Sequence, residues 1–158
     1  MAIRFKKISD LRVDNDLLQK DVAKILGVNK NTYPHWETGL YEIPLEIVDK
    51  LARHYGVSVD YLTGLSMAKE KKQYRPLDLE VLCARLKRVR KSYKLSQEEL
   101  ADKVDGLTQI NCSRYENGKV IIPFSKLFLI AKTLNVSLDY LLGRSDEMNI
   151  KKKNILIS

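Results

Sequence analysis

Residues 57–64, VSVDYLTG, recur at residues 136–143 as VSLDYLLG, with six identities in eight positions at an offset of 79. The same offset links further pairs: Gly39 with Gly118, Pro44 with Pro123, Trp36 with Tyr115, and Glu37 with Glu116. Upstream the offset is 78, which pairs Gln19 with Gln97 and Ala23 with Ala101 and puts one extra residue of the second copy within residues 104–107. A repeat of this kind predicts two copies of one structural unit.

Both copies have apolar residues at three- and four-residue steps and no stretch of strict alternation, so the pattern predicts helices throughout. We expect five helices in each copy, at residues 4–14, 19–26, 30–37, 44–55 and 58–63, then 78–92, 97–104, 109–116, 123–134 and 137–142. Ser58, Ser96 and Thr108 are the expected N-caps, because each precedes an apolar helical run. The fold class is therefore all-α, with two tandem five-helix domains.

The domain boundaries follow from polar stretches without an apolar period. We expect a first domain at residues 1–66, a basic linker at 67–76, a second domain at 77–144 and a basic tail at 145–158. The tail pairs a lysine run with three final apolar residues, Ile155, Leu156 and Ile157. Disorder and self-association both remain open for this segment.

The positive charge is confined to the second half of the chain. The net charge is +8, and residues 1–66 carry nine Lys and Arg against nine Asp and Glu, so the whole excess lies in residues 67–158. Such a balance favours a polyanionic partner. No apolar run approaches the roughly 18 residues of a membrane span, and the two cysteines have no paired spacing, so we expect a cytoplasmic protein without disulfides or metal.

In each copy, a short helix that opens with glutamine, a turn with glycine and a second short helix form a helix-turn-helix pattern. The second copy carries it in order: Gln97, Leu100, Ala101, Gly106, Tyr115, Glu116, Asn117, Gly118, Pro123, Val136, Ser137, Leu138 and Asp139. This set resembles the lambda-repressor-like helix-turn-helix family (Cro, phage-repressor and XRE-type proteins) over about 60 residues of each copy.

The resemblance implies a bacterial or phage-encoded transcription regulator, most simply a repressor, that binds double-stranded operator DNA without a cofactor. It also implies ion pairs between Arg12 and Glu37 and between Arg90 and Glu116 as structural links. No nucleophile with a base and no paired carboxylates stand out, so we expect no enzyme activity. Trp36 and Tyr115 are expected to fill the core.

The candidate DNA contacts of the second copy are polar residues at the start of the second helix of the motif, because that end enters the major groove. Gln and Asn can pair with adenine, Arg with guanine, and an apolar side chain can meet the thymine methyl group, whereas loop residues and a helix N-terminus suit phosphates. The candidates are Gln97, Gln109, Ile110, Asn111, Ser113 and Arg114 for bases, and Ser96, Asn117 and Lys119 for phosphates.

The first copy offers fewer such residues: Gln19, Lys30, Asn31, Thr32 and His35. Leu18 replaces the capping serine, the loop ETGLYE replaces ENGK, and Pro34 falls inside the expected helix at 30–37, which must therefore start late, kink or be strained. The second copy is thus the expected principal reader. For the first copy, auxiliary DNA binding and a protein-interaction role of antirepressor or antitoxin type both stay open, as does a homodimer on a palindrome.

Overall fold

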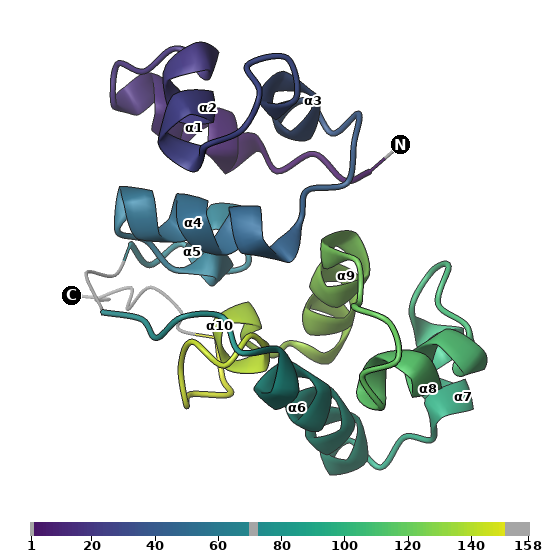
Figure 1. Ribbon diagram of the computed structural model, residues 1–158. Helices are drawn as coiled ribbons and strands as arrows, with labels where there is room; N and C mark the ends of the chain where they lie inside the picture. The colour runs from purple at the N-terminus through teal and green to yellow at the C-terminus, as the bar shows by residue number, and fades with distance from the viewer. Residues whose placement is uncertain (1, 70–72, 151–158) are drawn as a thin grey trace, which may run out of the picture. The chain divides into compact units, whose positions relative to one another are not determined.

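The computed structural model describes residues 2–69 and 73–150, which divide into two compact units (Figure 1). The first unit contains α1 (Lys6–Asp14), α2 (Gln19–Leu26), α3 (Tyr33–Glu37), α4 (Leu45–Tyr55) and α5 (Val59–Thr63). The second unit, Tyr74–Ile150, contains α6 (Leu79–Ser92), α7 (Gln97–Lys103), α8 (Gln109–Glu116), α9 (Phe124–Leu134) and α10 (Leu138–Leu141). The all-α prediction of two five-helix repeats is confirmed.

Helix starts follow the caps that the sequence indicated. Ser58 Oγ accepts from the Tyr61 amide at 2.9 Å, Ser96 Oγ from Glu99 at 3.0 Å and Thr108 Oγ1 from Asn111 at 3.1 Å. Each bond satisfies one amide that the first helical turn would leave without an acceptor. The extra residue of the second copy lies in the turn between α7 and α8, where Gly106 adopts a φ of +70°.

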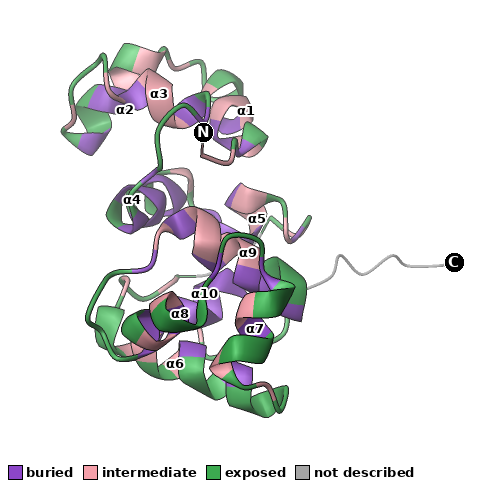
Figure 2. Ribbon diagram, turned by 90° about the vertical axis from the view of Figure 1, so that its right-hand side faces the viewer, coloured by how far each residue is buried: buried purple, intermediate pink, exposed green. Residues whose placement is uncertain are grey.

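The cores consist of the inward stripes of these short helices (Figure 2). Tyr115 is buried as expected, but the expectation for Trp36 is wrong, because Trp36 is only half-buried and Tyr33 is the fully buried aromatic residue of α3. Tyr33 and Glu37 are four residues apart and share the face of α3 that meets the core. Trp36 is displaced from that line and lies at the edge of the core.

Residues on both sides of the second repeat pack onto it. The Arg75 amide donates to the Arg144 carbonyl at 3.2 Å, and the Arg144 guanidinium lies 4.8 Å from the centre of the Tyr74 ring. The Ser137 amide donates to the Met148 carbonyl at 2.8 Å. Part of the expected linker and residues 145–150 of the expected tail therefore belong to the second unit, whereas residues 151–158 lie outside the described part of the chain.

In the described ranges the longest helix is α6, with 14 residues, and no helix there has the length and apolar character needed to cross a membrane.

Candidate nucleic-acid interface

Helix α8 separates its buried and solvent-facing residues cleanly. Cys112, Tyr115 and Glu116 are buried, so this side of the helix packs into the second unit. The opposite side carries the predicted base-reading residues: Gln109, Ile110 and Arg114 are exposed, and Asn111 and Ser113 are half-buried. The polar side chains in the first turn of α8 are therefore accessible to a binding partner.

A chain of hydrogen bonds links the buried core to the start of α8. Arg90 Nε donates to Glu116 Oε1 at 2.5 Å, and Arg90 Nη2 donates to Oε2 at 3.1 Å. Gln97 Nε2 also donates to Glu116 Oε2, at 3.0 Å, and Gln109 Nε2 donates to Gln97 Oε1 at 2.9 Å. The expected Arg90–Glu116 ion pair is present, and the side-chain amides of Gln97 and Gln109 connect it to the surface by hydrogen bonds.

The Glu116 carboxylate, at the buried end of this series of hydrogen bonds, determines how the side-chain amides of Gln97 and Gln109 are oriented. An ionised carboxylate only accepts hydrogen bonds, so Gln97 must turn its amino group toward Glu116 and its carbonyl oxygen toward Gln109. Gln109 then uses one N–H on Gln97 and keeps its Oε1 and its second N–H for an outside partner. Adenine presents the matching pair in the major groove, an N6 amino donor beside the N7 acceptor.

Glu116 and Arg90, at the buried end of this series of hydrogen bonds, are held in their ionised forms. Burial raises the pKa of Glu116, but hydrogen bonds from Arg90 and Gln97 outweigh it, so the pKa lies below its ordinary value. The hydrogen bond to Glu116 raises the pKa of Arg90 despite burial. Burial and the nearby Glu116 carboxylate raise the pKa of the Cys112 thiol to about 11, so Cys112 stays neutral beside the pair.

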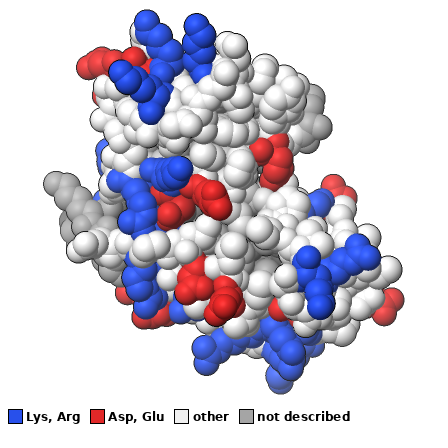
Figure 3. All heavy atoms as spheres, in the orientation of Figure 1, with Lys and Arg blue, Asp and Glu red and all other residues white. Residues whose placement is uncertain are grey.

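The predicted phosphate contacts flank α8 on the surface of the second unit. Ser96 forms a reciprocal cap with Glu99, whose Oε1 accepts from the Ser96 amide at 3.1 Å, so part of the α7 N-terminus is already satisfied within the protein. Asn117 Nδ2 donates to Ser113 Oγ at 3.3 Å, and Lys119 is exposed. Lysine and arginine side chains, with acidic ones among them, lie over this part of the second unit (Figure 3).

The first unit has a shorter version of the motif. Lys30, Asn31 and Thr32 precede α3 in a turn, because α3 begins at Tyr33 with Pro34 in its first turn. Of the three alternatives that the sequence left open, the helix starts late. Proline lacks an amide hydrogen, so it is tolerated in the first turn and not further inside a helix.

Of the remaining first-unit candidates, His35 is more enclosed than its second-unit counterpart Arg114, whereas Gln19 and its counterpart Gln97 are enclosed to a similar degree. His35 and Gln19 are half-buried, and the His35 ring lies 4.7 Å from that of Tyr41. The predicted ion pair is present, with Arg12 Nη2 at 2.7 Å from Glu37 Oε1. The Arg–Glu ion pair of the motif is thus present in both copies, whereas the first copy exposes fewer of the residues predicted to contact DNA.

Sequence reasoning missed the bonds that connect Gln97 to Glu116 and Gln109. The residues stand 19 and 12 positions apart, and no local spacing rule joins them. The available signal was indirect: glutamine opens both helices of the motif in the second copy, whereas lysine occupies the position of Gln109 in the first.

Comparison with known proteins identifies several relatives. The chain is 53% identical over 58 residues to the cryptic phage CTXphi transcriptional repressor RstR of Vibrio cholerae, covering 37% of this chain and 52% of the relative. It is 36% identical over 75 residues to the uncharacterized HTH-type transcriptional regulator YobD of Bacillus subtilis, covering 46% and 66%. Over 59 residues it is 30% identical to antitoxin PezA of Streptococcus pneumoniae, covering 37% of each chain.

The chain thus spans about half to two thirds of the length of the first two of these relatives. No solved structure matches it. The helix-turn-helix family matches it twice, at residues 8–62 and 86–141, and these two segments contain α2 with α3 and α7 with α8. The chain therefore belongs to the lambda-repressor-like helix-turn-helix family, of which it carries two copies.

Proposed function

We propose that this protein is a DNA-binding transcription regulator that reads double-stranded DNA in the major groove, mainly through α8 of the second unit. The observation that carries the proposal is the outward side of α8, where Gln109 is held by Gln97 and Arg114 is exposed. A pre-oriented amide and a free guanidinium are the groups that pair bidentately with adenine and guanine.

Charge supports the same assignment. Residues 67–158 carry the entire net charge of +8, which favours binding to phosphates with a steep dependence on salt. Asn117 and Lys119 extend from the loop after α8, where side chains of this kind suit the DNA backbone. Their first-unit counterparts are Thr38 and Leu40, of which only the threonine is polar.

We assign the first unit an auxiliary role in DNA binding. Its α3 has five residues, its charge is balanced, and its candidates Lys30 and Asn31 stand in a turn before the helix. The relatives named as a transcriptional repressor and transcriptional regulators favour regulation over a purely protein-binding role. Repression in a bacterial cytoplasm, by a bacterial or phage-encoded protein, is the simplest form of this function.

The test uses the full chain and a matched pair of substitutions. Double-stranded DNA selected from a random pool is labelled, and binding is followed by fluorescence anisotropy at two salt concentrations. Arg114→Ala should weaken binding to the selected site by about 1–3 kcal/mol and relax base preference at one position, because a bidentate contact is lost. His35→Ala, at the corresponding position of the first unit, should have a smaller effect.

Two results would contradict the proposal. If Arg114→Ala weakens binding equally on selected and random DNA, Arg114 contacts phosphate and does not read sequence. If His35→Ala costs more affinity than Arg114→Ala, the first unit is the principal reader.

A further inference from the structure

The start of the reading helix is capped in the same way in both units. In the second unit, Thr108 Oγ1 accepts from the Asn111 amide at 3.1 Å. In the first unit, Asn29 stands at the position of Thr108, and its Oδ1 accepts from the Asn31 amide at 2.8 Å. The Asn29 carbonyl also accepts from the Tyr33 amide at 3.3 Å, which is the four-residue spacing of an α-helix. The turn before α3 therefore presents its side chains as the first turn of α8 does.

The side chains in this turn differ between the units. Lys30 stands at the position of Gln109, and Asn31 stands at the position of Ile110, and all four residues are exposed. A glutamine amide pairs with adenine, which offers a donor beside an acceptor. A lysine ammonium carries only donors, so it pairs with the two acceptors of guanine, N7 and O6. The two units therefore favour different bases at the matching position.

Both ends of the segment that joins the units are held by the unit next to them. On the first-unit side, Ser66 is buried, and its amide donates to the Asp60 carbonyl at 3.0 Å. On the second-unit side, the Arg75 amide donates to the carbonyl of buried Arg144 at 3.2 Å. We call residues 67–74, which join these two anchors, the tether. From anchor to anchor the chain spans at most about 32 Å when fully extended.

The tether limits how far apart the two reading helices can lie on DNA. A unit of about 70 residues has a radius of gyration of about 11 Å, so the tether and the two units together reach about 55 Å. Major-groove sites on one face of DNA are about 34–36 Å apart for one helical turn and about 70 Å apart for two. One turn is therefore within reach of a single chain, and two turns are not.

We propose that one chain binds an asymmetric DNA site, which consists of two unlike half-sites about one helical turn apart. Lys30 reads guanine in the first half-site, at the position where Gln109 reads adenine in the second. The inference rests on the proposed DNA-binding function. A short tether keeps the first unit close to its half-site once the second unit is bound. A unit that binds weakly by itself then still raises the affinity of the whole chain, by about 10²–10⁴-fold.

The first test varies the DNA and uses the full chain. A site selected from random DNA should bind one chain, as measured by sedimentation of the complex. Adding about half a turn of DNA between the half-sites moves them to opposite faces and should lower the affinity by about tenfold or more. Adding about one turn should lower it as much, because the distance then exceeds the reach of the tether. A chain with a long Gly-Ser segment inserted after Gln73 should recover affinity for this last DNA.

The second test exchanges the two side chains that are expected to read different bases. Lys30→Gln should change the preferred base in the first half-site from guanine to adenine, by about tenfold in relative affinity. Gln109→Lys should make the reverse change in the second half-site. Lys50→Gln is the matched control, because Lys50 is exposed on α4 and the variant loses the same charge. It should leave both base preferences unchanged.

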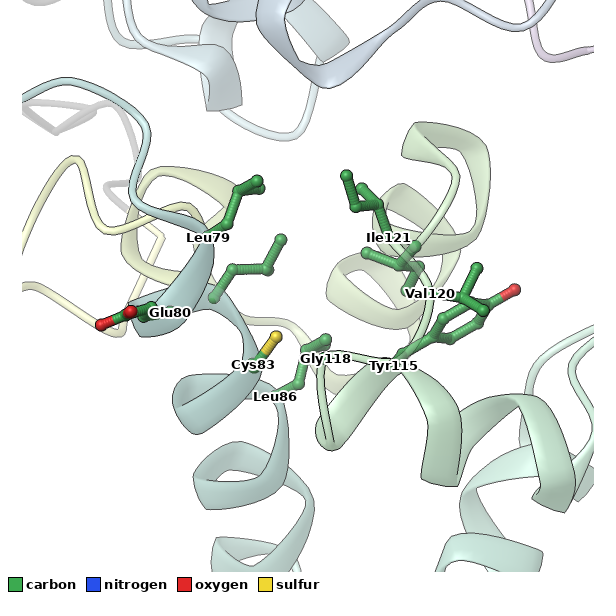
Figure 4. Close-up of a pocket in the computed structure, with 10 residues that line it drawn as sticks. Leu79, Glu80, Cys83, Leu86, Tyr115, Gly118, Val120 and Ile121 are labelled. Carbon is green, nitrogen blue, oxygen red and sulfur yellow. The ribbon is translucent and has the colours of Figure 1, made fainter.

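A second copy of the chain is the alternative occupant of the other half-site. One exposed apolar surface suited to such a contact borders a groove of about 330 Å³ between α6 and the α8–α9 loop. Cys83 points into this groove, and Ile121, which is 62% exposed, lies on its rim (Figure 4). Ile121→Ser removes an apolar side chain from the rim and leaves the tether and both reading helices as they are. The affinity for the selected site should therefore be unchanged.

Several results would overturn the inference. Two chains on the selected site, or a loss of affinity of about tenfold for Ile121→Ser, would assign the other half-site to a second copy. An affinity independent of half-site spacing would mean that the first unit is not bound. If Gln109→Lys changes base preference and Lys30→Gln does not, the second unit reads DNA as proposed and the first does not. If neither variant changes it, the proposed function itself fails.

Discussion

Replacing Glu116 with glutamine should destabilise the second unit by about 3 kcal/mol. Arg90 is 7% exposed, and Glu116 neutralises it with two hydrogen bonds. Glutamine keeps one acceptor oxygen, so one charge-assisted bond, worth about 1.5–3 kcal/mol, is lost and the guanidinium is left without a counter-charge. The bond from Arg90 Nη1 to the Leu95 carbonyl, at 2.7 Å, remains and limits the loss.

The repeat supplies a matched variant, Glu37→Gln, for the first unit. The Arg12 side chain is 16% exposed against 8% for Arg90, so its pair is more hydrated and the expected loss is about 2 kcal/mol. In a unit of this size the free energy of unfolding falls by about 1 kcal/mol for each molar of urea. These losses therefore lower the urea concentration at the unfolding midpoint by roughly 2–3 M. Glu98→Gln, on the exposed side of α7, should leave the midpoint unchanged.

The chain contains a natural reporter for this experiment. Trp36 is the single tryptophan and belongs to the first unit, so its fluorescence follows that unit, whereas far-UV circular dichroism follows the helices of both. Glu116→Gln should shift part of the dichroism transition and leave the fluorescence transition in place. A loss below 1 kcal/mol for Glu116→Gln, or equal shifts of both signals, would refute the reasoning.

Further outcomes follow from the same contacts. Gln97→Ala should reduce affinity and adenine preference at the base read by Gln109, because the amide loses its fixed direction; unchanged preference in a binding selection would contradict this. Lys119→Ala should weaken binding to all sequences alike, and it should reduce the slope of log binding constant against log salt concentration by about one, measured by anisotropy. Pro34→Ser should not improve DNA binding, because the first unit still lacks the phosphate-binding loop. The folded-state pKa of Glu116 is lowered, so its stabilisation is present above the unfolded pKa of about 4.3 and is lost as pH falls further; Glu116→Gln should flatten that acid limb in thermal melts.

The sequence by itself determined the repeat, the helices and their caps. The repeat follows from comparing the chain with itself, and the helices and their caps depend on residues within one or two turns of each other, such as Ser96 with Glu99, so local spacing was sufficient for them. The Arg90–Glu116 pair spans 26 positions, and it was predicted only because the motif resembles a family in which that pair links two helices.

Tertiary structure alone decided the features that depend on packing between distant segments. The sequence showed that Pro34 conflicts with a long helix, but only the packing of Tyr33 into the core fixed where α3 begins and left Trp36 at the edge. The bonds from Glu116 through Gln97 to Gln109 exist because the start of α7 packs against α8. Likewise, the open groove at Cys83 exists because the loop approaches α6, and burial between non-neighbouring elements cannot be deduced from periodicity along a single helix.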